Sequence, residues 1–138
     1  MCDDPENQAQ FPLVINFAEV GHLAVCGSIV SGKSTFVQTL LYAIIQKYQP
    51  DWVNLYVLDF SSHMLNAFVT APHVGGIMSE DDIEKIDKFF FMMENMMEDR
   101  KKLFSGGNYA QYVQANGVVL PSIVIALDNI GAFREKTE

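Results

Sequence analysis

Nine consecutive residues near the start of the chain have the types and spacing of a phosphate-binding loop. The run GSIVSGKST matches the pattern GxxxxGK[ST] in full. Its glycines permit backbone angles that turn successive N–H groups toward phosphate oxygens. A helix that begins behind the loop would add the positive end of its dipole. The pattern predicts an anion cradle, formed by Gly27, Ser28, Ile29, Val30, Ser31, Gly32, Lys33, Ser34 and Thr35.

Two side chains of this loop have defined roles in nucleotide binding. We expect the Lys33 ammonium to reach the β- and γ-phosphates of ATP and the Ser34 hydroxyl to ligate Mg²⁺. Thr35 lies one step further along the phosphate chain. A glycine-rich turn that binds nothing is the alternative. The flanks favour the phosphate loop, because 23–26 is apolar like a buried strand and 36–45 has the apolar spacing of a helix.

A carboxylate for the metal is expected at the end of a later strand. The apolar segment 121–129 is typical of a strand, and Asp128 lies at its carboxyl end. In phosphate-loop enzymes an Asp in this position holds Mg²⁺ or its bound water. A turn or N-cap role is the alternative for a lone Asp after a strand. Together with the loop, Asp128 predicts a metal site shared with Ser34.

The residue after Asp128 bears on hydrolysis. Many ATPases of this type have a Glu there, which accepts the proton of the attacking water, whereas this chain has Asn129. An amide can orient a water but is not a base near neutral pH. We expect a chain that binds ATP and hydrolyses it slowly, with Lys33, Asp128 and Asn129 as candidate catalytic positions. Asp59, at the end of an earlier strand, is either a substitute base or a cap of the loop that follows it.

The elements around these residues must form a sheet that positions them. Apolar patterns predict an edge strand over 12–17, a core strand over 52–60 and a helix that stops before Pro50. A helix between two apolar strands is a βαβ unit, which gives parallel strands. The sequence therefore predicts an α/β fold with a mainly parallel sheet, residues 12–138 as one domain and residues 1–11 as a polar tail.

A long helix is predicted in the second half of the chain. Residues 61–76 are irregular, with a short helix around 63–68. The long helix begins at an N-cap, Ser79, with acidic residues 80–82 on its first turn, and runs to about Phe104. Its apolar stripe is interpreted as sheet-facing core, with a docking groove of flexible methionines as the alternative. The stripe consists of Ile83, Ile86, Phe90, Met93 and Met97, widened by Phe89, Met92 and Met96.

Composition argues against several classes of protein. The 138 residues carry a formal net charge of −8, which disfavours a protein whose main task is to hold nucleic-acid phosphates. The two cysteines, Cys2 and Cys26, form no metal motif, so a reducing cytosolic compartment fits best, with Cys26 as a buried inert thiol. No stretch has the length and apolarity of a membrane span, and the acidic start is unlike a signal peptide.

Several short motifs, taken in order, resemble the FtsK/SpoIIIE superfamily. They are HLAVCG at 22–27 leading into the loop, DF at 59–60, PHV at 72–74, MEDR at 97–100, LPSIVI at 120–125 and FRE at 133–135. Within the superfamily the set is most similar to the tandem ATPase modules of type VII secretion motors, the EssC/EccC family. The resemblance covers nearly the whole chain from about residue 13.

The resemblance implies a RecA-like P-loop NTPase fold of three α/β/α layers, with ATP and Mg²⁺ as cofactors. It implies work on the cytoplasmic side, in a bacterial membrane-anchored motor that exports WXG100-type proteins. The implied partners are neighbouring modules of that motor and those exported proteins, with the membrane reached only through the parent. In such motors, modules beyond the first often bind ATP with altered catalytic residues. The family also has a further strand beside the Asp128 strand, so we expect a C-terminally truncated chain with exposed sheet edges.

Other functions share the loop pattern. A DNA translocase module of the same superfamily is disfavoured by the acidity, since the one basic run, 100–102, is expected at a helix end. A small-molecule P-loop kinase would carry a substrate-binding arginine set and a lid, and neither is evident. A docking module that keeps nucleotide only as structural filler is close to the leading interpretation.

Overall fold

The computed structural model describes residues 2–117 and 119–137 of the chain. These residues form two compact units, Met1–Lys33 and Ser34–Glu138, each with its own internal structure. None of the described helices is both long enough and apolar enough to cross a bilayer.

The first unit contains a short hairpin and a single helical turn. Strand β1 (Cys2–Asp4) pairs antiparallel with β2 (Ala9–Phe11), and α1 (Phe17–Val20) follows. The predicted edge strand over 12–17 is wrong, because residues 12–16 have no regular structure and Phe17 begins α1.

The predicted strand over 23–26 is also wrong. These residues lie in an irregular segment, and Cys26, expected to be buried, is exposed. An apolar run becomes a strand only where a neighbour supplies ladder hydrogen bonds. In the described part of this unit, the hairpin residues pair only with each other. The predicted βαβ unit over 23–60 therefore lacks its first strand in the described structure, although its helix and its second strand are present.

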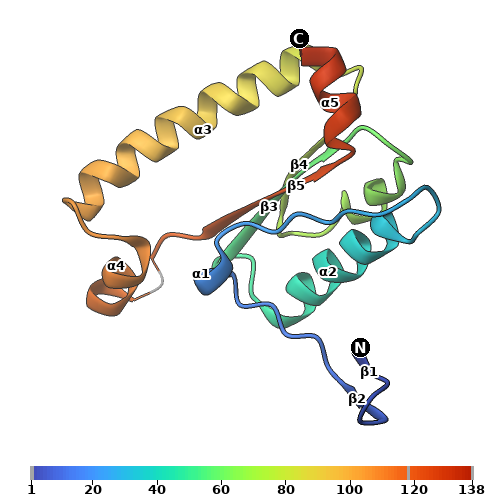
Figure 1. The fold of residues 1–138 in the computed structure, drawn as a ribbon. Helices are drawn as coiled ribbons and strands as arrows, with labels where there is room; N and C mark the ends of the chain where they lie inside the picture. Colours follow the sequence, from blue (N-terminus) through green and yellow to red (C-terminus); the bar gives the residue numbers. More distant parts are fainter. Residues whose placement is uncertain (1, 118, 138) are drawn as a thin grey trace. The chain divides into compact units, whose positions relative to one another are not determined.

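The second unit is built on a parallel three-stranded sheet (Figure 1). The order of the strands is β4-β3-β5. The strands are β3 (Val53–Asp59), β4 (Val74–Met78) and β5 (Ser122–Asp128). The prediction of an α/β fold with a parallel sheet is confirmed, and β3 and β5 lie where the apolar runs predicted strands. Strand β4 was missed, since 61–76 was expected to be irregular.

Helices cover both faces of this sheet. One face of β3 is covered by α2 (Lys33–Lys47) and the 3-10 helix η1 (Met64–Phe68). The other face is covered by α3 (Ile83–Phe104) and α5 (Ile130–Thr137). Side chains of a strand alternate between faces. Leu55 and Val57 therefore enter the first core cluster, and Leu58 and Phe60 enter the second. The predicted end of α2 before Pro50 and the predicted short helix near 63–68 are confirmed.

The start of α3 differs from the prediction. The helix begins at Ile83 with Asp82 as its N-cap, so Ser79 is not the cap. Instead, the backbone N–H and hydroxyl of Ser79 donate to the Asp82 carboxylate at 2.9 and 3.2 Å. The backbone hydrogen bond is the main reason that the pKa of Asp82 lies below its usual value. Residues 80–82 form the turn before the helix, whereas the predicted end at Phe104 is confirmed.

The buried stripe of α3 is narrower than the predicted one. Ile86, Phe89 and Met93 are buried, whereas Ile83 and Met97 are 56% and 59% exposed. Both flanks of the helix are apolar, so periodicity alone did not say which flank faces the sheet.

Two helices in the described part of the second unit were not predicted from the sequence. Helix α4 (Tyr109–Asn116) opens with a capping box between Asn108 and Gln111, and α5 (Ile130–Thr137) follows β5 directly. The corner between α3 and α4 is fastened to the amino end of β5. Arg100 Nη2 donates to Pro121 O at 2.6 Å, and the Tyr109 hydroxyl donates to Leu120 O at 2.8 Å.

Candidate functional site

The phosphate loop is folded back on its own carbonyl groups. Lys33 Nζ donates to Gly27 O and to Ser28 O, both at 2.7 Å. The Ser31 N–H donates to Ser28 O at 3.2 Å and closes a turn. A Cβ on Gly27 would lie 2.5 Å from Ser31 Oγ, so this close approach favours glycine. These contacts hold the Lys33 ammonium over the loop, where an anion bound by the loop would meet it.

The second unit joins the start of α2 to the end of β5. Ser34 Oγ donates to Asp128 Oδ2 at 2.7 Å, across 94 positions of sequence. Asp128 is buried at 9% exposure, and it is the last residue of β5. The register of β3 and β5 aligns Asp59 with Asp128, so both carboxylates lie at the carboxyl end of the sheet. In open α/β sheets this is the end at which ligands bind.

The donor chemistry at Ser34 and Asp128 fits Mg²⁺. A hydroxyl and a carboxylate are hard oxygen ligands, and Mg²⁺ usually takes only one or two protein carboxylates and completes its shell with water and phosphate. The described residues contain no group of three or more His, Cys, Asp or Glu that could hold a metal. An ion here would therefore depend on phosphate and water oxygens, as in nucleotide sites.

Asn129 has a structural task. Its backbone is left-handed, with φ 72°, a region in which Asn is one of the tolerated residues. Its side-chain oxygen accepts the backbone N–H of Ala132 at 3.1 Å, and its carbonyl accepts the first bond of α5 from Phe133. Asn129 is thus the N-cap of α5. The amide oxygen that would orient a water is directed at the helix.

Asp59 has the geometry of a loop cap. Its side chain is fully buried, and its oxygens accept the N–H groups of Ser61 and Leu65 at 3.1 and 3.2 Å. Of the two roles left open by the sequence, the hydrogen bonds favour the capping role.

The predicted site residues form two groups, and hydrogen bonds connect the residues within each group. Gly27, Ser28, Ser31 and Lys33 interact within the first unit, and Ser34 interacts with Asp128 within the second. Ile29 and Val30 are 91% and 98% exposed at the tip of the loop. Gly32 has φ 91°, which only glycine adopts readily. Thr35 is exposed, and its carbonyl accepts a hydrogen bond from Thr39 on α2.

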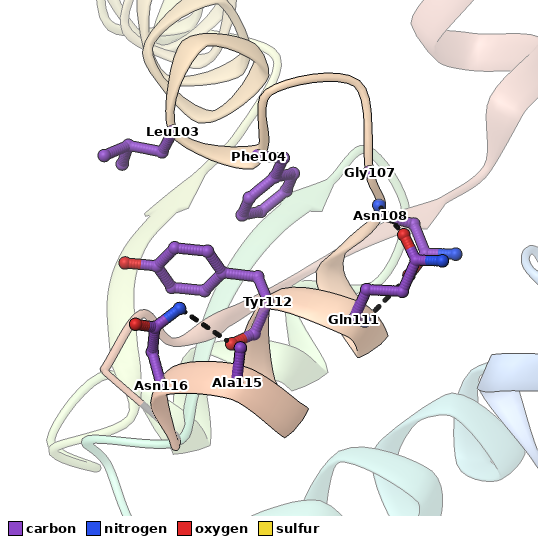
Figure 2. A pocket seen from close by; sticks show the side chains of 8 residues that line it. All are labelled: Leu103, Phe104, Gly107, Asn108, Gln111, Tyr112, Ala115 and Asn116. Carbon is purple, nitrogen blue, oxygen red and sulfur yellow. Dashed lines mark hydrogen bonds between the residues drawn. The ribbon is translucent and has the colours of Figure 1, made fainter.

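A separate pocket of about 240 Å³ lies at the corner of α3 and α4 (Figure 2). The sequence pattern that could have drawn attention to this corner is Asn108-x-x-Gln111, a capping box of the kind that opens a helix. The two side chains bond to each other's backbone N–H groups, and the Asn116 amide bonds to Tyr112 O. Since the corner is fastened to the amino end of β5, the pocket lies at the opposite end of that strand from Asp128. Its lining residues are Leu103, Phe104, Gly107, Asn108, Gln111, Tyr112, Ala115 and Asn116.

Comparison with known proteins gives one family. The model of the FtsK/SpoIIIE family matches residues 3–129. A curated relative, the type VII secretion system protein EssC of Staphylococcus aureus (strain MRSA252), is 29% identical over 136 residues, or 96% of this chain. The chain spans only 9% of the length of that relative.

Two solved structures are similar over almost the whole chain. One is EssC (ATPases 2 and 3) from Geobacillus thermodenitrificans, with a TM-score of 0.90, 32% identity, and coverage of 99% of this chain and 27% of that one. The other is Thermomonospora curvata EccC (ATPases 2 and 3) in complex with a signal sequence peptide, with a TM-score of 0.86, 25% identity, and coverage of 96% and 26%. The resemblance predicted from the order of the motifs is confirmed.

Proposed function

Because the chain belongs to the FtsK/SpoIIIE family, we propose that it is an ATP-binding module of a type VII secretion ATPase of the EssC/EccC kind. It holds ATP with Mg²⁺ and has weak or no hydrolysis of its own. The observation that carries this proposal is the 2.7 Å hydrogen bond from the Ser34 hydroxyl to the Asp128 carboxylate. It brings together the two oxygen donors that a phosphate-loop site offers to Mg²⁺.

The loop supports the choice of a polyphosphate ligand. Its tight turn and the Lys33 ammonium supply the donors and the positive charge that such a ligand needs, within a chain whose net charge is −8. When bound, Mg²⁺ would neutralise the charge between the phosphates, and Ser34 and Asp128 are the residues that would hold it. The finer description of the fold, a RecA-like P-loop NTPase, is part of this proposal.

Slow hydrolysis follows from the two residues nearest to the position of a general base. Asn129 caps α5 with its side chain, and Asp59 is tied to the loop that follows β3. Neither offers a free carboxylate to an attacking water. A well-positioned general base accelerates hydrolysis by about 10²–10⁴-fold. The lack of a free carboxylate here supports a module that binds ATP and hydrolyses it slowly.

The partners proposed for the module come from its relatives. The similar solved structures contain ATPases 2 and 3, and one of them includes a signal sequence peptide. A further similar structure is described as the cytoplasmic domain of EssC. We therefore propose that this module acts next to other ATPase modules, on the cytoplasmic side of a membrane-anchored parent, in the export of WXG100-type proteins.

Titration of the 138-residue chain with ATP and Mg²⁺ in a calorimeter tests the proposal. We expect saturable binding that Lys33→Ala weakens by at least about tenfold, because hydrogen bonds to charged groups contribute about 1.5–3 kcal/mol each. Lys47→Ala is the matched control, because it removes the same charge from the other end of α2 and should leave the affinity unchanged. Unchanged affinity after Lys33→Ala would remove the basis for the phosphate loop.

A second assay separates the export module from the DNA translocase alternative. In a mobility shift with double-stranded DNA, we expect no salt-sensitive complex from this acidic chain. A complex that weakens steeply with salt would favour the translocase.

A further inference from the structure

The tip of the phosphate loop is a turn with an unsuitable residue at its third position. The turn runs from Ser28 to Ser31 and is closed by the hydrogen bond from Ser31 N–H to Ser28 O at 3.2 Å. Val30 has φ 62°, whereas Ile29, the residue before it, is not among the positive-φ residues. A positive φ confined to the third position is the signature of a type II turn, which calls for Gly or Asn there.

Valine is poorly suited to this conformation. The left-handed region crowds Cβ against the carbonyl oxygen, and a β-branched residue is a genuine outlier there. No packing offsets the strain, because Val30 is 98% exposed. The neighbouring Gly32, at φ 91°, shows the residue type that such a position normally takes.

The strained turn belongs to the same folded loop that holds Lys33. Both carbonyl acceptors of the Lys33 ammonium, Gly27 O and Ser28 O, lie at or just before this turn. If the turn opens, the two carbonyl groups move apart and the ammonium loses its position over the loop. A ligand that needs the closed loop binds with an affinity reduced by the fraction of time that the loop is closed.

We propose that Val30 acts as a built-in restraint on ligand affinity, holding the loop's affinity for polyphosphate below the value that glycine at this position would give. This inference rests on the proposed function, since it concerns the same loop. Weaker binding of this origin appears mainly as faster release. The restraint therefore keeps nucleotide exchangeable in a module that hydrolyses it slowly.

The expected size follows from two opposing effects. The left-handed conformation disfavours a residue with a Cβ by a factor of about 5 to 30. Part of this gain is offset in the glycine variant, by a factor of roughly two to five, because glycine has more conformational freedom to lose when the loop closes. Val30→Gly should therefore bind about three- to tenfold more tightly, and tenfold corresponds to about 1.4 kcal/mol.

Calorimetric titration of the full chain with Mg²⁺-ATP, and separately with inorganic tripolyphosphate, tests the inference. Tripolyphosphate probes the loop without contributions from base and ribose. Ile29→Gly is the matched control, since Ile29 is also β-branched and is 91% exposed in the same turn but lacks the positive φ. It should bind about two- to fivefold more weakly than the natural chain, because glycine adds freedom to the open loop without relieving strain.

The outcomes distinguish this inference from the proposed function. Tighter binding by Val30→Gly together with weaker binding by Ile29→Gly supports the restraint. If the natural chain binds ATP and Val30→Gly binds it no more tightly, the restraint is refuted and the proposed function stands. If neither the natural chain nor Val30→Gly binds either probe, both are refuted.

Discussion

Substitutions at Asn129 test whether this residue is a structural cap in place of a catalytic base. Asn129 combines a left-handed backbone, φ 72°, with a side-chain hydrogen bond to Ala132 N–H at 3.1 Å. Asn129→Asp keeps an acceptor of the same reach and tolerates the backbone. Asn129→Gly keeps the left-handed backbone but loses the side-chain acceptor. Asn129→Ala loses the acceptor and also disfavours the left-handed backbone. The three variants therefore separate the two contributions.

The magnitudes follow from these two contributions. Replacing an N-cap by Ala costs about 0.5–2 kcal/mol of unfolding free energy, whereas Gly costs only a few tenths. The left-handed angle adds roughly 1–2 kcal/mol for Ala, and because both effects share one residue their sum is an upper bound. We expect Asn129→Ala to destabilise the chain by about 1.5–3 kcal/mol, and Gly and Asp to stay within about 0.5 kcal/mol of the natural residue.

Urea unfolding followed by tryptophan fluorescence measures these differences. Trp52 is the one tryptophan of the sequence, and its carbonyl accepts the N–H of Ser122, the first residue of β5. It therefore reports on the β3–β5 pairing. With a slope of about 1–3 kcal/mol/M, a loss of about 2 kcal/mol shifts the midpoint by roughly 1 M. If Asn129→Ala and Asn129→Gly have equal urea midpoints, the argument that the left-handed backbone penalises alanine is refuted. If both midpoints equal that of the natural chain, the capping role of the side chain is refuted as well.

The same variants show whether a missing base limits hydrolysis. Asn129→Asp adds a carboxylate at little structural cost, whereas Asn129→Glu would place a longer side chain on the strained backbone. A carboxylate at this position is held by Ala132 N–H, away from any attacking water. We therefore expect Asn129→Asp to raise the single-turnover rate by less than about tenfold, although a well-positioned base gives about 10²–10⁴-fold. A hundredfold rise would refute the argument that the side chain is directed at the helix.

Two further predictions concern the second unit. A Cβ on Gly75 would lie 2.5 to 2.9 Å from atoms of the Tyr56 side chain, whose ring also packs on Phe89. Gly75→Ala should therefore lower the unfolding free energy by about 1–3 kcal/mol. Gly76→Ala, which meets nothing within 4 Å, should change it far less, and equal losses would argue against the clash. Because the Ser79 backbone hydrogen bond holds the folded pKa of Asp82 below its usual value, this contact stabilises the chain above the usual pKa and its contribution is lost as pH falls through the lower, folded pKa. The difference in unfolding free energy between the natural chain and Asp82→Asn should therefore shrink as pH falls below the usual pKa of an Asp in urea titrations, and a constant difference would contradict the assignment.

The elements predicted correctly are those whose signals are local. Strands β3 and β5 are apolar runs bounded by turn residues, and α2 ends where proline cannot continue a helix. The segments 12–17 and 23–26 carry the same apolar signal but lack a pairing partner in the described structure, and pairing is not encoded locally. The predicted apolar stripe of α3 was too broad for the same reason, because the element that packs on the helix decides which of its flanks is buried.

The candidate site divides along similar lines. The motif predicted the loop, and the position of Asp128 at the carboxyl end of an apolar strand predicted its place beside Ser34. What the sequence does not display are backbone angles. The positive φ of Val30 and the capping geometry of Asn129 emerge only when the chain is folded, and both alter the interpretation of the site.

The register between β3 and β5 has a consequence for synthesis of the chain. Val53 pairs with Ser122, so the central strand β3 and its neighbour β5 are 69 positions apart in the sequence. At about 5–20 residues per second, a ribosome needs roughly 3–14 s to deliver the second strand after the first. During that interval β3 can pair only with β4, and its buried residues face a half-formed core. The last step of folding must therefore wait for the strand that carries Asp128, and pulse-labelled nascent chains stopped before residue 122 should lack protease resistance in β3.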